Sequence, residues 1–404
     1  PKIETAWAIF HESTEGNKID EYDEEEFNTS FTYNLATKDQ KEIARIGVDE
    51  FTQLIPFVLA FIPVIDSVNI IDNINYTKTK FESSEELEDD VLVNIIKTEN
   101  KMKFEIKLLF ATENDVTIAS IVEKTENGYA IKSLKDYPKL FCDFPLIGTE
   151  CFHFPVIVNS FYFNPLTERE GIWLKGDGKK EVEENREILE KAVQLYGQLL
   201  KKITDLNFCD YFNICLSKIP STSEKYFDDK WYENNIQKSL REIITESKVV
   251  ETEDDKVLFS DVRFPDPDLK KEEREKIWKF SSDLNVNILP SKKHIHKWAE
   301  IIWNDCAIVD YANIVSDLNT KKNILNLQIC LNIEIDAVIE WLQELYEFLI
   351  SNNCIELFNE NEIVPNKFGD FKKINEIYKG KKFDSIRKQW IENKQLNYCL
   401  YLDE

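Results

Sequence analysis

Glycine is scarce in this chain, with 10 glycines among 404 residues. A phosphate-binding loop needs glycines at fixed spacing, because backbone N–H groups must approach the phosphates closely. The stretch most similar to such a loop, Gly176-Asp-Gly-Lys179, lacks the GxxxxGK[ST] spacing. We therefore predict a flexible turn there and no phosphate cradle in the chain.

Histidine is also scarce, and paired cysteines are absent. The histidines are His11, His153, His294 and His296, and none of the eight cysteines stands in a CxxC pair. His294 and His296 are two residues apart, which places the rings on different faces of a helix. We predict no metal site there or elsewhere in the chain. Scattered cysteines are typical of free thiols in a reducing compartment, so we expect a cytoplasmic protein.

Positive charge is outnumbered: 50 Lys and Arg residues stand against 75 Asp and Glu, a net charge of −25. Such a surface repels nucleic acid and anionic lipid, so we expect neither as a partner.

The apolar run 54–65 is too short to span a bilayer and contains two prolines. The locally basic segment 367–388 is open to two interpretations, a dock for an acidic partner or simple charge balance. No GxSxG or HExxH motif supports hydrolase chemistry.

Two kinds of apolar spacing divide the chain. Residues 68–131 contain runs rich in β-branched residues with polar links between them, which predicts a mainly antiparallel sheet. Beyond about residue 180 the spacing is that of amphipathic helices. The fold class is therefore α+β. We predict a strand over 30–35, a hairpin over 354–374, and helices over 3–12, 181–203, 229–246, 270–283, 293–305, 334–350 and 384–394; a helix is also predicted from the cap at Thr37 to near Pro56.

Arg169 stands between two glutamates just after an apolar run, FPVIVNSFYF at 154–163. In the simplest interpretation it forms an exposed ion pair with Glu168 or Glu170. The alternative is a placed cation, because a guanidinium is always charged and its fork matches phosphate oxygens.

The residues around Arg169 resemble a known family. The stretch from Cys142-Asp-Phe-Pro-Leu through Pro155-Val-Ile-Val-Asn-Ser-Phe, followed by Arg169 and Ile172-Trp173, is similar to the repeated region of sacsin-like proteins. Those proteins have a Pro-Val-His-Val-Asn-Gly-Phe-Phe strand at this place, and here Ile157 replaces the histidine. The turn is also similar to the Leu-Asn-x-Ser-Arg-Glu turn of heat-shock chaperones of the GHKL ATPase class. Trp173 stands where those chaperones have a glutamine.

The resemblance implies a site and a function. In those chaperones the arginine contacts the terminal phosphate of ATP, which assigns that role to Arg169 as a catalytic residue, with Asn164, Thr167 and Glu170 as the cofactor-binding residues around it. ATP and Mg would be bound only through a nucleotide lobe outside this chain. The chain would then be the transducer, or partner-sensing portion, of a chaperone-like ATPase, inactive alone.

The resemblance also implies a division of the chain. Residues 1–37 would be the tail of a GHKL nucleotide-binding domain, 38–66 a linker helix, 67–220 an α/β middle domain and 221–404 a mostly helical C-terminal region. The expected partners are a protein client or partner subunit and the N-terminal ATPase domain, and a homodimer is left open. A bacterial defence role is an analogy from the family alone. The alternative function is a non-enzymatic protein-interaction scaffold in which Arg169 is only an ion pair.

Overall fold

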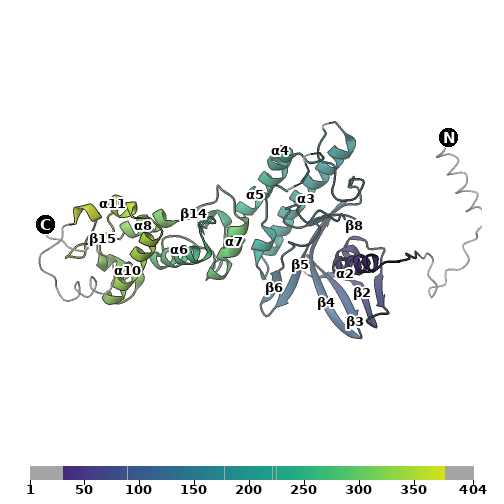
Figure 1. The fold of residues 1–404 in the computed structure, drawn as a ribbon, viewed down its shortest axis with the longest axis horizontal. Coiled ribbons are helices and arrows are strands. Elements are labelled where there is room, and N and C mark those ends of the chain that lie inside the picture. The colour runs from purple at the N-terminus through teal and green to yellow at the C-terminus, as the bar shows by residue number, and fades with distance from the viewer. Residues whose placement is uncertain (1–30, 89, 177, 221, 224, 378–404) are drawn as a thin grey trace, which may run out of the picture. The chain divides into compact units, whose positions relative to one another are not determined.

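The computed structural model describes residues 31–377 except 89, 177, 221 and 224. The chain divides into two compact units, residues 1–53 and 54–404. The predicted α+β class is confirmed: a mostly antiparallel sheet comes first in the chain, and helices dominate after it (Figure 1). The helices predicted over 3–12 and 384–394 lie outside the described residues.

Helix α2 (Lys38–Phe61) begins in the first unit and continues into the second. Its predicted cap is present, because the Thr37 hydroxyl accepts from the Gln40 backbone N–H at 3.2 Å and the Gln40 amide oxygen accepts from the Thr37 N–H at 3.2 Å. The strand predicted over 30–35 is not found where the chain is described, from residue 31. A strand needs a hydrogen-bonded neighbour, and none of the described strands pairs with this segment.

The main sheet belongs to the second unit. Five strands form an antiparallel meander, β1 to β5, and β9 then continues the sheet beside β5. β7 runs parallel to β9, β8 pairs with β7, and β10 runs parallel to β6. The strands are β1 (Ser67–Asp72), β2 (Thr77–Glu88), β3 (Leu92–Glu99), β4 (Met102–Glu113), β5 (Val116–Thr125), β6 (Gly128–Ile131), β7 (Leu140–Cys142), β8 (Phe144–Pro145), β9 (Ile157–Asn159) and β10 (Phe208–Cys209).

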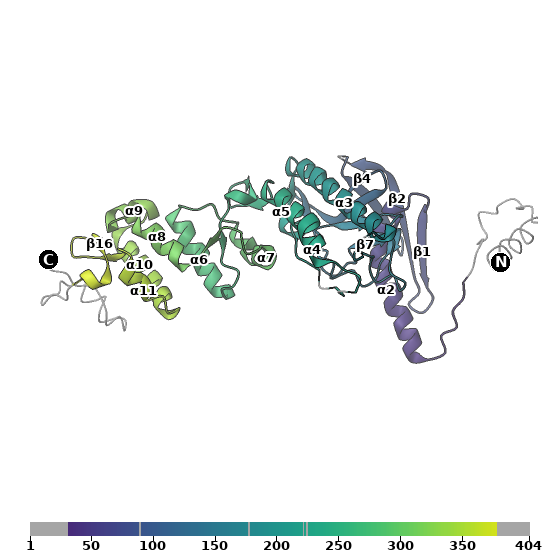
Figure 2. The same ribbon diagram turned by 90° about the horizontal axis from the view of Figure 1, so that it is seen from above.

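Both faces of this sheet are covered. Leu108 and Leu109 point to opposite faces of β4, yet both are fully buried. Helix α3 (Lys180–Thr204) packs on one face, where its apolar stripe joins a core with Leu109 (Figure 1, Figure 2). The buried end of α2 lies near β7, with the Phe61 ring 5.2 Å from that of Phe141.

The remaining elements are mostly helical, as predicted. The helices are α4 (Asp229–Tyr232), a π-helical turn (Glu233–Gln237), α5 (Lys238–Thr245), α6 (Lys271–Leu284), α7 (Ile295–Ile301), α8 (Tyr311–Asn319), α9 (Ile324–Leu331), α10 (Ile335–Ser351) and α11 (Glu356–Glu360), with 3₁₀ turns η1 (Tyr211–Ile214), η3 (Phe259–Asp261), η4 (Lys292–His294) and η5 (Ile374–Glu376). Three two-stranded ladders pair β11 (Val250–Glu251) with β12 (Lys256–Val257), β13 (Phe264–Pro265) with β14 (Ile308–Val309), and β15 (Val364–Pro365) with β16 (Phe371–Lys372). The last ladder is a hairpin within the segment 354–374 predicted to form one, but the first part of that segment is helix α11. None of the helices among the described residues combines the length and apolar composition needed to cross a bilayer.

Buried side chains form two large cores in the second unit. The first contains the α3 stripe and also Tyr232, Ile244 and Ile302, so it extends past residue 220, the limit predicted for the middle domain. The reason is that helices α4 and α5 contribute apolar side chains to the same core as α3. The second core lies within residues 277–371 and is built around α10.

Lys139 is a buried charge that makes a testable contribution to stability. It is 3% exposed, and its ammonium donates to the carbonyl oxygens of Leu134 and Tyr137. Burial lowers its pKa from 10.5 to about 8. Between these values the unfolded chain binds more protons than the folded chain, so this group makes the free energy of unfolding rise with pH.

Lys139→Met should therefore remove a destabilisation that is present below pH 8 and is relieved as the pH rises to 10.5. Urea denaturation at these two pH values measures it: wild type should gain stability relative to the variant as pH rises. Lys135→Met, at an exposed position nearby, is the control and should follow wild type at both pH values. An equal pH dependence in wild type and Lys139→Met would contradict the assignment.

Candidate functional site around Arg169

Arg169 lies in a tight, strained turn. Pro165 and Ile172 form an antiparallel bridge at its base, and the Leu166 N–H donates to the Gly171 carbonyl at 2.8 Å. The Arg169 N–H donates to the Leu166 carbonyl at 2.9 Å. Arg169 itself has φ 57°, in the left-handed region that costs a non-glycine residue about 1–3 kcal/mol. Such a conformation persists only where the surrounding structure imposes it.

The guanidinium of Arg169 is held by backbone carbonyls. Its Nη2 donates to the carbonyl oxygens of Cys142 at 3.3 Å and Phe144 at 3.5 Å, on the β7–β8 hairpin. That hairpin is tied to strand β9, because the Asp143 N–H donates to the Asn159 side-chain oxygen at 2.9 Å. Asn159 is 5% exposed, so the bond is well shielded from water. The arginine is thus braced against the end of the main sheet formed by β9, β7 and β8.

No ion pair involving Arg169 is present among the described residues. Glu168 and Glu170 flank it and are exposed, and neither contacts its guanidinium. The charge instead acts on a thiol: burial raises the pKa of Cys142, and the adjacent Arg169 offsets part of that rise. The guanidinium is therefore available to an anion.

Exposed apolar side chains lie on and next to the hairpin that holds this arginine. We define the Arg169 surface as Arg169 with Phe144, Ile147, Phe161 and Tyr162, whose side chains are between 47% and 68% exposed. The members are linked through the hairpin, since the Cys142 thiol donates to the Phe161 carbonyl at 3.5 Å and the Phe161 and Tyr162 rings are 5.6 Å apart. Aromatic residues and arginine are the residue types that contribute most to protein interfaces. The surface thus combines an apolar rim with a single cation.

The three predicted cofactor-binding residues, Asn164, Thr167 and Glu170, differ in their surroundings. Thr167 and Glu170 are exposed in the same turn as Arg169. The Asn164 side chain instead donates to Glu184 on α3 at 3.0 Å. This bond ties Asn164 to the fold at the base of the turn.

Asn185 was not predicted as part of the site, yet it holds the base of the turn. It is fully buried on α3, accepts from the Asn164 N–H at 2.7 Å, and donates to the carbonyls of Asn164 and Trp173, both at 2.9 Å. One signal could have revealed it: Asn185 falls on the apolar stripe of α3, three residues before Ile188. A polar residue in a buried stripe needs partners, and here they are backbone groups of the turn.

Asn185→Ala should destabilise the fold, because it removes three hydrogen bonds. Each buried polar group left unpaired costs about 1–3 kcal/mol, so a loss of several kcal/mol is expected. Guanidinium denaturation measures this, with Glu187→Ala at an exposed position of α3 as control. The control should lie within about 0.5 kcal/mol of wild type. Equal stabilities for the two variants would show that Asn185 does not hold the turn.

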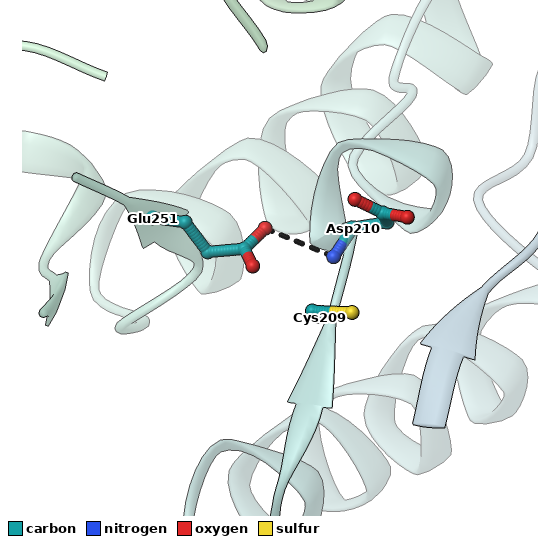
Figure 3. Close-up of side chains that lie close together, drawn as sticks. All are labelled: Cys209, Asp210 and Glu251. Carbon is teal, nitrogen blue, oxygen red and sulfur yellow. Dashed lines mark hydrogen bonds between the residues drawn. The ribbon is translucent and has the colours of Figure 1, made fainter. Parts of the chain in front are cut away.

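A second group of ionisable side chains lies elsewhere in the same unit. We define the Cys209 cluster as Cys209, Asp210, Glu251 and His294. The Cys209 sulfur and one carboxylate oxygen each of Asp210 and Glu251 lie within 4.8 Å of one another (Figure 3). His294 Nε2 is 3.1 Å from an Asp210 oxygen. Burial raises the pKa of both Cys209 and Glu251, and the carboxylates next to Cys209 add to its rise.

Comparison with known proteins identifies no relative. No family model matches the chain, and neither does any curated protein or solved structure.

Proposed function

We propose that this chain is the transducing, partner-sensing portion of a sacsin-like, chaperone-related ATPase. In this function Arg169 contacts the terminal phosphate of an ATP molecule held, with Mg, by a nucleotide lobe outside this chain. The chain alone then neither binds nor hydrolyses ATP. The partner that docks here is the nucleotide lobe, and a protein client or second subunit contacts other surfaces.

The observation that carries the proposal is the state of Arg169. It is exposed and strained, it pairs with no carboxylate of the described residues, and it is braced by two carbonyls. An arginine whose only role is a surface ion pair needs none of this bracing. A phosphate-binding arginine benefits from it, since a group placed in advance needs no reorganisation when charge develops on the phosphate.

The Arg169 surface supports docking of a second lobe. Its exposed aromatic side chains would be covered when the lobe binds, and Arg169 would then lie where water is excluded and its attraction to phosphate is greater.

The alternative is an interaction scaffold without an enzymatic role. The exposed rim of the Arg169 surface favours protein binding under either function. The two differ in whether the cation is needed for ATP turnover.

ATP turnover by the longer protein that includes the nucleotide lobe tests the proposal. Arg169→Ala should lower turnover, whereas Arg263→Ala, at an exposed arginine far along the chain, should not. Calorimetry on residues 1–404 alone should detect no ATP binding at micromolar concentration. Wild-type turnover in the Arg169 variant would favour the scaffold, and micromolar ATP binding by the chain alone would contradict a lobe outside it.

A further inference from the structure

Three segments far apart in the sequence meet at the Cys209 cluster. Cys209 ends strand β10, Asp210 leads into η1, Glu251 ends β11, and His294 ends η4. The Asp210 N–H donates to a Glu251 carboxylate oxygen at 2.9 Å, which joins the first two segments (Figure 3). Asp210 adopts a left-handed backbone conformation, φ 62°, at this junction. The sharp turn allows Cys209 and Asp210, neighbours in the chain, to serve the same cluster.

One ring nitrogen of His294, Nδ1, has no hydrogen-bond partner. His294 is 5% exposed, and its ring packs at a tilt against that of Phe212, with the ring centroids 4.9 Å apart, which restricts its rotation. Its Nε2 bonds to Asp210, but its Nδ1 has no hydrogen-bond partner and lies 3.6 Å from a Glu251 oxygen. A buried ring nitrogen without a partner is rare and costly. A cation between Nδ1 and the Glu251 oxygen would satisfy it.

The donor set favours one class of metal. A thiol, an imidazole and two carboxylates are ligands of zinc, whereas calcium and magnesium prefer oxygen alone. Atoms bound to one zinc ion at about 2.0–2.3 Å lie roughly 3–4 Å apart. The sulfur and carboxylate oxygens of Cys209, Asp210 and Glu251 are already within 4.8 Å of one another, so a small inward movement would bring them to that spacing. His294 lies outside this group, so its ring must also shift toward the other three before it can be the fourth ligand.

Burial raises the pKa of Glu251, and the charges of Lys256 and Lys293 offset part of that rise without forming an ion pair with it. Lys256 donates to the carbonyl oxygens of Thr204 and Leu206 and is thereby engaged elsewhere. Lys293 forms no ion pair with the described residues. The Asp210 side chain is 31% exposed, which leaves a path for an ion to enter.

We propose that the Cys209 cluster is a four-ligand zinc site. Four protein ligands fill the tetrahedral positions, which is typical of structural rather than catalytic zinc. The metal would hold β10, β11 and η4 together at the edge of the first core. The sequence predicts no metal site, and the proposal departs from that prediction because His294 lies with residues distant in the chain and not with His296, which contacts Glu275.

Metal binding by the full chain tests this proposal. Cobalt(II) is the spectroscopic probe: a thiolate charge-transfer band should develop with one ion per chain in wild type and in Cys151→Ser. Cys209→Ser should lack the band. Zinc affinity, measured by competition with a chromophoric chelator, should fall at least about 10-fold in Cys209→Ser, Glu251→Gln and His294→Asn, and zinc should raise the melting temperature of wild type.

Circular dichroism establishes that each variant is folded before it is compared. Folded wild type that binds neither cobalt nor zinc at micromolar metal overturns the proposal. Unchanged zinc affinity in Cys209→Ser overturns it too, since other cysteines would then hold the metal. Wild-type affinity in His294→Asn alone would overturn the four-ligand assignment.

Discussion

Leu342→Asp is expected to unfold the second core. Leu342 is fully buried near the middle of α10, within the apolar stripe that the sequence predicts over 335–349. Removing a buried leucine side chain costs about 2–5 kcal/mol, and a carboxylate buried without a partner adds several kcal/mol. The sum is comparable to the whole stability of a typical domain, about 5–15 kcal/mol. We therefore expect a partly unfolded chain at room temperature.

Trp341 reports on this unfolding. Its indole N–H donates to Asp283 at 2.7 Å, and its ring packs edge-on against Phe280 at 5.3 Å. Leu342→Asp should shift tryptophan fluorescence to the red and remove a transition from the calorimetric trace. Ile335→Asp is the matched control, because Ile335 is 39% exposed in the first turn of the same helix, where an acidic residue is favourable. If both variants melt like wild type, the position of Leu342 in the core is wrong.

Strands and helices with a clear apolar period were predictable from the sequence. VTIASIVE and FEIKLLFA lie in β5 and β4, and the stripe through Ile188 and Leu199 forms α3. Strand β2 reads TKTKFESSEELE and carries little of this signal, because pairing on both sides by β1 and β3 holds it in place. Helix α9 reads ILNLQICL, and its nearly uniform apolarity hides the helical period.

Parts of the two candidate sites could not be predicted in the same way. Arg169 stands out as a single arginine in an acidic turn, but its bonds to the carbonyls of Cys142 and Phe144 depend on the β7–β8 hairpin reaching the turn. The Cys209 cluster joins residues separated by about 40 positions in the chain. Local spacing rules for metal ligands find ligands a few residues apart, so they miss a site that only tertiary packing assembles.

Arg169→Ala should lower ATP turnover of the longer protein by about 10²–10⁴-fold, provided that the proposed function is correct. Hydrolysis spreads negative charge over the terminal phosphate oxygens, and a guanidinium fork matches that geometry. The carbonyls of Cys142 and Phe144 hold the group before that charge develops. The loss should therefore appear in kcat with little change in ATP affinity, because a group that acts mainly in the transition state adds little to ground-state binding.

Two further substitutions separate chemistry from fold at this position. Arg169→Lys should rescue turnover poorly, since an ammonium offers a point charge without the fork. Arg169→Gly should lower turnover as Arg169→Ala does, yet it should not lower the melting temperature, because glycine adopts the φ of 57° without strain. Turnover and melting temperature measured on the same preparations distinguish the outcomes. A large loss of stability in Arg169→Gly would show that the arginine mainly stabilises the fold. Wild-type ATP turnover in Arg169→Gly and Arg169→Ala would show that Arg169 does not act at the nucleotide site, and protein binding would then be the role of the Arg169 surface.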